Sequence, residues 1–160
     1  MIIYITIDYI RLHSKAVRKP FLILFGQMLR RREFNSFTGG TYLLLASFIS
    51  MIIFPEPGIF ICATSFLVIG DTVAALVGLK FGRQKVFRKS VEGTVACLIS
   101  CLLIAFVVSK LPQKSLVLGV GIIGAFAATI VEALPIEVND NVVIPIVSGA
   151  IMQVLKLFIS

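Results

Sequence analysis

Apolar runs of membrane-spanning length dominate this chain and restrict what it can fold into. They cover residues 38–54, 59–79, 93–109, 115–131 and 141–159. A helix needs roughly 20 mostly apolar residues to cross the hydrocarbon core of a bilayer. The chain is 58% hydrophobic and only 14% charged, which is more apolar than an ordinary soluble domain. The sequence therefore predicts an all-α, polytopic integral membrane protein built as a helical bundle.

The first 32 residues predict a different arrangement. Residues 1–10 make half a span, as expected of a helix that is tilted or whose beginning lies outside this sequence. Residues 11–32 alternate basic clusters with the apolar block 21–25, which favours a helix lying in the membrane interface. We therefore expect about five or six transmembrane helices plus one interfacial helix, in a single domain covering residues 1–160.

The positive charges lie next to the apolar runs. The net charge is +7, and the basic residues are concentrated in 11–32 and 80–89. Juxtamembrane Lys and Arg generally face the cytoplasm, so they predict topology here and do not indicate nucleic-acid binding. If both segments lie in the cytoplasm and successive spans alternate in direction, the connector 132–140 lies on the cytoplasmic side as well. The most polar connectors would then all face the cytoplasm.

One carboxylate interrupts the apolar runs. Asp71 lies inside the run 59–79, and Gly70, Ala74 and Gly78 form a stripe of small residues beside it. Small residues let helices approach closely, so this stripe directs Asp71 toward neighbouring helices and away from lipid. An ionisable residue inside a membrane has a high energetic cost, so it is by default expected to be functional. The alternative is a structural carboxylate that a hydroxyl or backbone partner satisfies.

A second carboxylate has a similar setting. Gly124, Ala128 and Glu132 are spaced four residues apart, so they share one helix face at the cytoplasmic end of the run 115–131. This spacing predicts that Glu132 lies on a close-packing surface. A solvated residue at the end of a helix is the alternative.

Three polar residues, Asn139, Asp140 and Asn141, lie at the start of the last apolar run. They suit an ordinary turn and helix N-cap. Three consecutive oxygen-bearing side chains equally suit a hard cation such as Mg²⁺. The spacing alone leaves both interpretations open.

A basic loop connects the helix of Asp71 to the next one. Its positive residues are Lys80, Arg83, Lys85, Arg88 and Lys89. Ser90 can cap the following helix, Gly93 keeps its first turn slim, and backbone N–H groups at a helix start favour an anion. The loop lacks the glycine spacing of a Walker A motif. The loop predicts phosphate binding. The alternative is that its positive charges serve only to set the membrane topology.

Together these residues form an extended pattern, Gly70-Asp71-Thr72-x-Ala74-Ala75-x-x-Gly78-x-x-Phe81-Gly82 followed by Lys89-Ser90-x-Glu92-Gly93-Thr94. The pattern resembles the dolichol kinase, phytol kinase and CTP-dependent diacylglycerol kinase family, which is related to the phosphatidate cytidylyltransferases. Further segments are similar to other parts of that family, namely Asp8-x-x-Arg11-Leu12, Val131-Glu132-Ala133 and Asn139-Asp140-Asn141.

The resemblance implies an enzyme that transfers the γ-phosphate of CTP to the hydroxyl of a membrane lipid alcohol, with Mg²⁺ or another divalent cation. It implies a metal set of Asp71 with Glu92 or Asp140. It implies that the triphosphate is bound by Arg83, Lys85, Lys89, Ser90, Glu92, Gly93 and Thr94. The catalytic set would be Asp71, Glu132 and Asp140, with Asn139 and Asn141 as further polar groups nearby. Either Glu132 or Asp140 would take the proton of the lipid hydroxyl.

Two other functions fit parts of the pattern. A cytidylyltransferase would make a CDP-lipid, but such enzymes usually carry Pro-Lys-Lys-Thr where this chain has Arg88-Lys89-Ser90. A small carrier or assembly subunit would line an ion path with Asp71 and Glu132, which the positive charges beside Asp71 oppose. We predict the kinase. The sequence leaves open whether it works alone, as a homo-oligomer or with a partner subunit.

Overall fold

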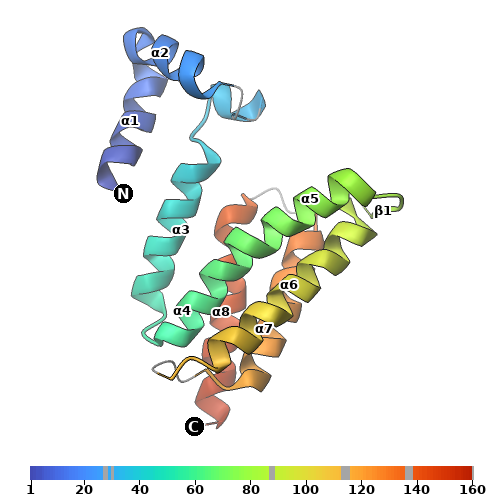
Figure 1. The fold of residues 1–160 in the computed structure, drawn as a ribbon. Coiled ribbons are helices and arrows are strands. Elements are labelled where there is room, and N and C mark those ends of the chain that lie inside the picture. The colour runs from blue at the N-terminus through green and yellow to red at the C-terminus, as the bar shows by residue number, and fades with distance from the viewer. Residues whose placement is uncertain (27–28, 30, 87–88, 113–115, 136–138, 160) are drawn as a thin grey trace. The chain divides into compact units, whose positions relative to one another are not determined.

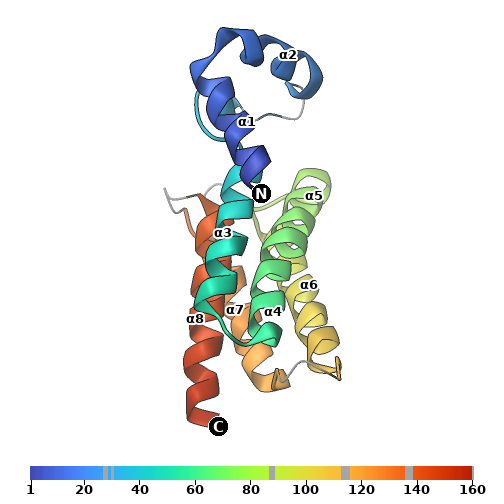
Figure 2. The ribbon, with the colours of Figure 1, turned by 90° about the vertical axis from the view of Figure 1, so that its left-hand side faces the viewer.

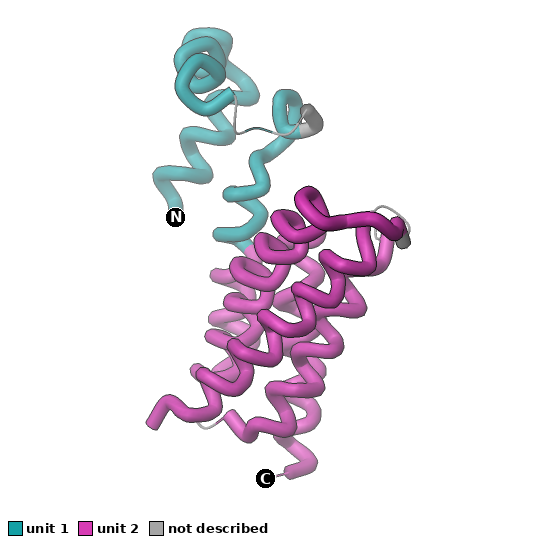
Figure 3. The backbone as a smooth tube through the Cα atoms, turned by 45° about the vertical axis from the view of Figure 1, so that its right-hand side comes forward, with its two compact units in different colours: residues 1–45 teal, residues 46–160 magenta. Residues whose placement is uncertain are grey.

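The computed structural model of the chain describes residues 1–26, 29, 31–86, 89–112, 116–135 and 139–159. Within these ranges the chain is helical apart from one short pair of strands (Figure 1). It forms two compact units, Met1–Leu45 and Ala46–Ser160 (Figure 3). The all-α prediction is confirmed. The assignment of residues 1–160 to one domain stays a prediction.

The first unit contains short helices. These are α1 (Ile2–His13), α2 (Lys15–Phe25), the 3₁₀ turn η1 (Arg31–Phe34) and the beginning of α3 (Gly39–Ile53). Ser14 is extended and separates α1 from α2. α1 has 12 residues, which agrees with the predicted half-span. Ile23, Leu24 and Phe25 of α2 are exposed, as an interfacial helix requires, and that location stays a prediction.

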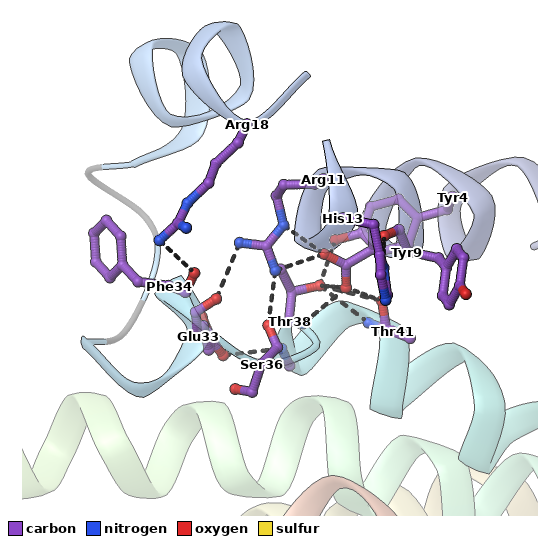
Figure 4. Close-up of polar contacts among 12 residues, drawn as sticks. Tyr4, Tyr9, Arg11, His13, Arg18, Glu33, Phe34, Ser36, Thr38 and Thr41 are labelled. Carbon is purple, nitrogen blue, oxygen red and sulfur yellow. Dashed lines mark hydrogen bonds and ion pairs between the residues drawn. The ribbon is translucent and has the colours of Figure 1, made fainter. Parts of the chain in front are cut away.

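A buried ion pair connects the elements of this unit (Figure 4). Arg11 Nε donates to Asp8 Oδ1 at 2.8 Å, and each residue is only 1% exposed. The Arg11 guanidinium also donates to the backbone carbonyls of Glu33 and Ser36, at 3.0 and 2.7 Å. Asp8 Oδ2 accepts from the backbone N–H and the hydroxyl of Thr38, at 2.8 and 3.0 Å. The pair therefore ties α1 both to η1 and to the start of α3.

The second unit is a bundle of apolar helices. It contains the end of α3 and then α4 (Pro57–Ser65), the π-helical segment η2 (Phe66–Asp71), α5 (Thr72–Phe81), β1 (Lys85–Val86), β2 (Lys89–Ser90), α6 (Val91–Ser109), α7 (Leu118–Ala133) and α8 (Asp140–Ile159). α6 packs against α5 and α7, and α8 packs against α7 and α4 (Figures 1 and 2). β1 and β2 form an antiparallel hairpin between α5 and α6. α4, η2 and α5 form one continuous helical path.

The predicted spans correspond to helices. Pro57–Phe81, Val91–Ser109 and Asp140–Ile159 are long and apolar enough to cross a membrane, and Gly39–Ile53 and Leu118–Ala133 are shorter apolar helices. The chain is therefore a helical membrane protein. Fewer helices reach full spanning length among the described residues than the five or six expected. Pro55 and Pro135 follow the ends of the two shorter helices, and proline does not continue a helix.

The packing of α5 on α6 depends on Gly93. A Cβ at Gly93 would lie 2.7 Å from the carbonyl oxygen of Ala74 and 3.3 Å from Gly78 Cα. Backbone atoms cannot turn aside as a flexible side chain can, so we expect Gly93→Ala to destabilise the bundle by about 1–3 kcal/mol. Gly119→Ala in α7 is the matched control, because nothing lies within 4 Å of its Cβ and alanine favours a helix. Thermal unfolding of the two purified variants measures the difference, and equal midpoints would contradict the prediction.

Candidate active site

Four side chains from different elements meet in the second unit. Lys89 Nζ, on β2, lies 2.8 Å from Glu132 Oε1 and 3.1 Å from Asp140 Oδ2. Asp71 Oδ1 lies 3.8 Å from the same nitrogen. The sequence singled out these three carboxylates separately, and the structure brings them together around one ammonium. Their catalytic roles stay predictions.

A π-helical turn and a glycine position Asp71. η2 ends at Asp71, and π-helical turns inside α-helices occur frequently at functional sites. A Cβ at the preceding Gly70 would lie 2.8 Å from Cys101 Sγ of α6. The absence of a side chain at Gly70 therefore lets η2 approach α6 closely, as the stripe of small residues predicted.

Glu132 lies on the buried face of α7. Gly124, Ala128 and Glu132 are all buried, as their spacing predicted. A Cβ at Gly124 would lie 2.5 Å from Met152 Sδ, so this face lies directly against α8. The alternative of a solvated residue at the helix end is wrong, because Glu132 is 2% exposed.

The start of α8 positions Asp140. Asn139 Oδ1 accepts a hydrogen bond from the backbone N–H of Asn141 at 3.1 Å. The carbonyl of Asn139 also accepts from the N–H of Val142 at 2.9 Å. Asn139 therefore caps α8, which was one of the two interpretations that the spacing left open. With the cap supplied by its neighbour, the carboxylate of Asp140 accepts its hydrogen bond from Lys89.

The hairpin and a helix cap position Lys89. Lys89 pairs with Val86, and Ser90 pairs with Lys85. Ser90 Oγ accepts from the backbone N–H of Gly93 at 3.1 Å and so caps α6, as predicted. The backbone is thus fixed by the strand pair and by the cap immediately after it. The side chain of Lys89 is directed at the carboxylates as a result.

The cluster contains a charged lysine and one carboxylate oxygen without a partner in the described part of the chain. Burial alone would lower the pKa of Lys89, but the hydrogen bonds and charges of Glu132 and Asp140 outweigh it, and the pKa is raised. Lys89 is therefore an ammonium at neutral pH. Glu132 Oε2 is buried and has no hydrogen-bond partner among the described residues. A buried carboxylate oxygen without a partner is costly, so the cluster retains an unsatisfied acceptor.

The other predicted nucleotide ligands lie around the hairpin. Glu92 Oε1 accepts from the backbone N–H of Arg83 at 3.0 Å, which links α6 to the loop after α5. The N–H of Val91 donates to the carbonyl of Gln84 at 3.0 Å, so this group and that of Gly93 already have partners. Anion binding would therefore depend more on side chains than on the helix start. The remaining candidates have varied exposure: Arg83 and Lys85 are exposed, Thr94 and Asn141 are half-buried, and Arg88 lies outside the described residues.

The carboxylates surround Lys89 without forming a metal centre by themselves. In the described ranges, no group of three or more His, Cys, Asp or Glu side chains is arranged to hold a metal ion. The predicted metal set of Asp71, Glu92 and Asp140 stays a prediction. Sequence reasoning did not assign Glu132 to that set, although the structure places it nearest to Lys89. The burial of its helix face, read from Gly124 and Ala128, was the signal available.

A related protein places the chain in a family. An uncharacterized protein of Rickettsia prowazekii (strain Madrid E) is 31% identical to it over 145 residues, which cover 88% of this chain and 71% of that protein. The chain belongs to the family of this Rickettsia protein.

A second relative has an activity in its name. CTP-dependent diacylglycerol kinase 1 of Schizosaccharomyces pombe is 28% identical over 168 residues, which cover 92% of the chain and 74% of that kinase. No family model and no solved structure matches the chain. The chain is thus a distant homologue of this CTP-dependent diacylglycerol kinase.

Proposed function

We propose that the protein is a CTP-dependent lipid kinase, which transfers the γ-phosphate of CTP to the hydroxyl of a membrane lipid alcohol. The observation that carries this proposal is the half-buried cluster in which Lys89 meets Glu132, Asp140 and Asp71. The distant kinase homologue supports CTP as the donor and a lipid as the acceptor. Diacylglycerol is the acceptor that this relationship favours, with a polyprenol or phytol as alternatives.

The basic side chains suit the phosphates of the nucleotide. Phosphoryl transfer depends on positioning and charge stabilisation more than on covalent chemistry. Lys89 would bind the triphosphate. The exposed Arg83 and Lys85 would extend this positive surface along the hairpin. The half-buried Thr94 would add a hydroxyl in the first turn of α6.

One or two carboxylates of the cluster, together with the phosphates of the substrate, would suit a divalent cation. Mg²⁺ prefers oxygen ligands and usually combines one or two carboxylates with substrate phosphates. Glu132 and Asp140 supply the nearest oxygens, and the unpartnered Oε2 of Glu132 is a further donor. When bound, such a cation would neutralise charge on the phosphates. Asp71 completes the carboxylate set in this proposal, whereas Glu92 contacts the backbone of Arg83.

Asp140 is the better placed acceptor for the proton of the lipid hydroxyl. Its side chain is 32% exposed, compared with 3% for Glu132. Asp140 Oδ2 accepts from Lys89, and Oδ1 of the same carboxylate would take the proton. The burial of Glu132 suits it instead to a fixed, charge-stabilising role.

We also propose that this site faces the cytoplasm. The cluster lies where α7 ends and α8 begins, and Lys89 joins it from the basic hairpin. Positive residues next to spanning helices favour the cytoplasmic side. CTP would then reach the site from the cytosol, and the lipid alcohol would reach it from the membrane interface.

CTP labelled separately at the α and the γ phosphate tests the proposed function. The purified protein is incubated with Mg²⁺, one labelled CTP and either diacylglycerol, a polyprenol, phytol or phosphatidate, and the organic phase is counted. We expect label from the γ position only, on one of the three alcohols. Label from the α position on phosphatidate would instead make the protein a cytidylyltransferase. No label from either position would contradict both activities.

A further inference from the structure

Three carboxylates face a single ammonium in the cluster. Glu132 and Asp140 are within hydrogen-bonding distance of Lys89 Nζ, and Asp71 lies at 3.8 Å. The buried Oε2 of Glu132 has no hydrogen-bond partner among the described residues, so this acceptor is available to a further ligand. An all-oxygen set of carboxylates is typical of sites for hard divalent cations.

The ammonium and such a cation would need the same oxygens. Lys89 Nζ lies 2.8 and 3.1 Å from one oxygen each of Glu132 and Asp140. Mg²⁺ binds oxygens at roughly 2.0–2.1 Å, so a cation bound to both carboxylates would lie within the space that Nζ occupies. Two positive charges at that separation repel strongly where water is scarce. The two occupants therefore exclude each other.

The side chain of Lys89 can move away from the carboxylates. Its ammonium is a point charge on a flexible four-carbon stem, and its side chain is 28% exposed. The exposed Arg83 and Lys85 show that this part of the chain opens to solvent, where a polyanion can approach. A triphosphate would offer Lys89 new negative partners outside the carboxylate cluster.

We propose that Lys89 is a built-in counter-ion that competes with a divalent cation for Glu132, Asp140 and Asp71, so that the cation binds tightly only after a polyanion has drawn the ammonium away. The identity of the polyanion as CTP rests on the proposed function. The presence of a cation site at these carboxylates rests on it as well. By linkage, a polyanion that raises cation affinity is itself bound more tightly when the cation is present.

Mn²⁺ binding in the absence of nucleotide tests the competition, with electron paramagnetic resonance of free Mn²⁺ as the readout. We expect Lys89→Gln to bind Mn²⁺ about tenfold or more tightly than the wild-type protein, because the competing charge is gone. Lys80→Gln is the matched control, since Lys80 lies over the ring of Phe81 in α5, and its affinity should equal that of the wild type. Equal or weaker Mn²⁺ binding by Lys89→Gln would overturn the proposal.

A second measurement uses the wild-type protein and does not depend on the folding of a variant. Reductive methylation followed by mass spectrometry reports how accessible each lysine amine is. We expect Lys89 to react more slowly than Lys80, and Mn²⁺ alone, at a saturating concentration, to accelerate Lys89 several-fold relative to Lys80 as it displaces the ammonium. A rate for Lys89 that Mn²⁺ leaves unchanged or lowers would overturn the competition. Because neither assay contains CTP, a failure of the labelled-CTP experiment leaves these results separately interpretable.

Discussion

Asp71→Asn is expected to abolish lipid phosphorylation, with a loss of about a thousandfold or more, in a protein that still folds in the membrane. The amide keeps the size of the side chain but removes the negative charge that lies 3.8 Å from Lys89 Nζ. Glu132 and Asp140 still hold Lys89, so the bundle should keep its packing. The rate of γ-phosphate transfer from CTP to diacylglycerol measures the loss, and thermal unfolding of the purified variant measures folding.

Glu56→Gln is the matched control for this variant. Glu56 precedes α4 and forms an ion pair with Lys156 near the end of α8, whereas the cluster contains Asp140 at the start of α8. This substitution also replaces a carboxylate that pairs with a lysine, but at the opposite end of α8. Its phosphorylation rate should stay close to that of the wild type. Near-normal transfer by Asp71→Asn would remove Asp71 from the catalytic set.

The helices were predictable because apolar runs and prolines act locally. The run 59–79 corresponds to the continuous path of α4, η2 and α5, and the run 93–109 to α6. The π-helical turn was not predictable, because η2 differs from an α-helix only in its hydrogen-bonding register. The hairpin before α6 was also missed. Its strands have two residues each, which is too short to show an alternating pattern.

The site was predictable in its parts and not in its assembly. Helix faces lined with small residues showed that Asp71 and Glu132 point toward other helices, and this requires only the helical period. The contact between Lys89 and Asp140 joins residues 51 positions apart, and no local pattern carries such a distance. From the sequence, Lys89 was therefore predicted only to bind the phosphates. Its pairing with three carboxylates depends on how four elements pack.

In the first unit, the environment of Arg11 could likewise not be predicted from the local sequence. Its position in the basic segment 11–32 predicted a juxtamembrane charge, yet the structure buries it against Asp8. The guanidinium lies 5.0 Å from the centre of the Phe21 ring and donates to the carbonyls of Glu33 and Ser36. Asp8-x-x-Arg11 is therefore a structural element, in which the spacing of three residues places both side chains on one face of α1.

Arg11→Ala should destabilise the first unit by about 3–5 kcal/mol, because it leaves the buried carboxylate of Asp8 without its cationic partner. It also deprives the carbonyls of Glu33 and Ser36 of their donor. Arg18→Ala is the matched control, since Arg18 donates to Phe34 O and Asn35 Oδ1 in more exposed positions and should cost about 1 kcal/mol or less. Amide hydrogen exchange over α1 and the first turn of α3 measures this unit by itself. Equal protection in the two variants would show that the Asp8–Arg11 pair does not determine the stability of the unit.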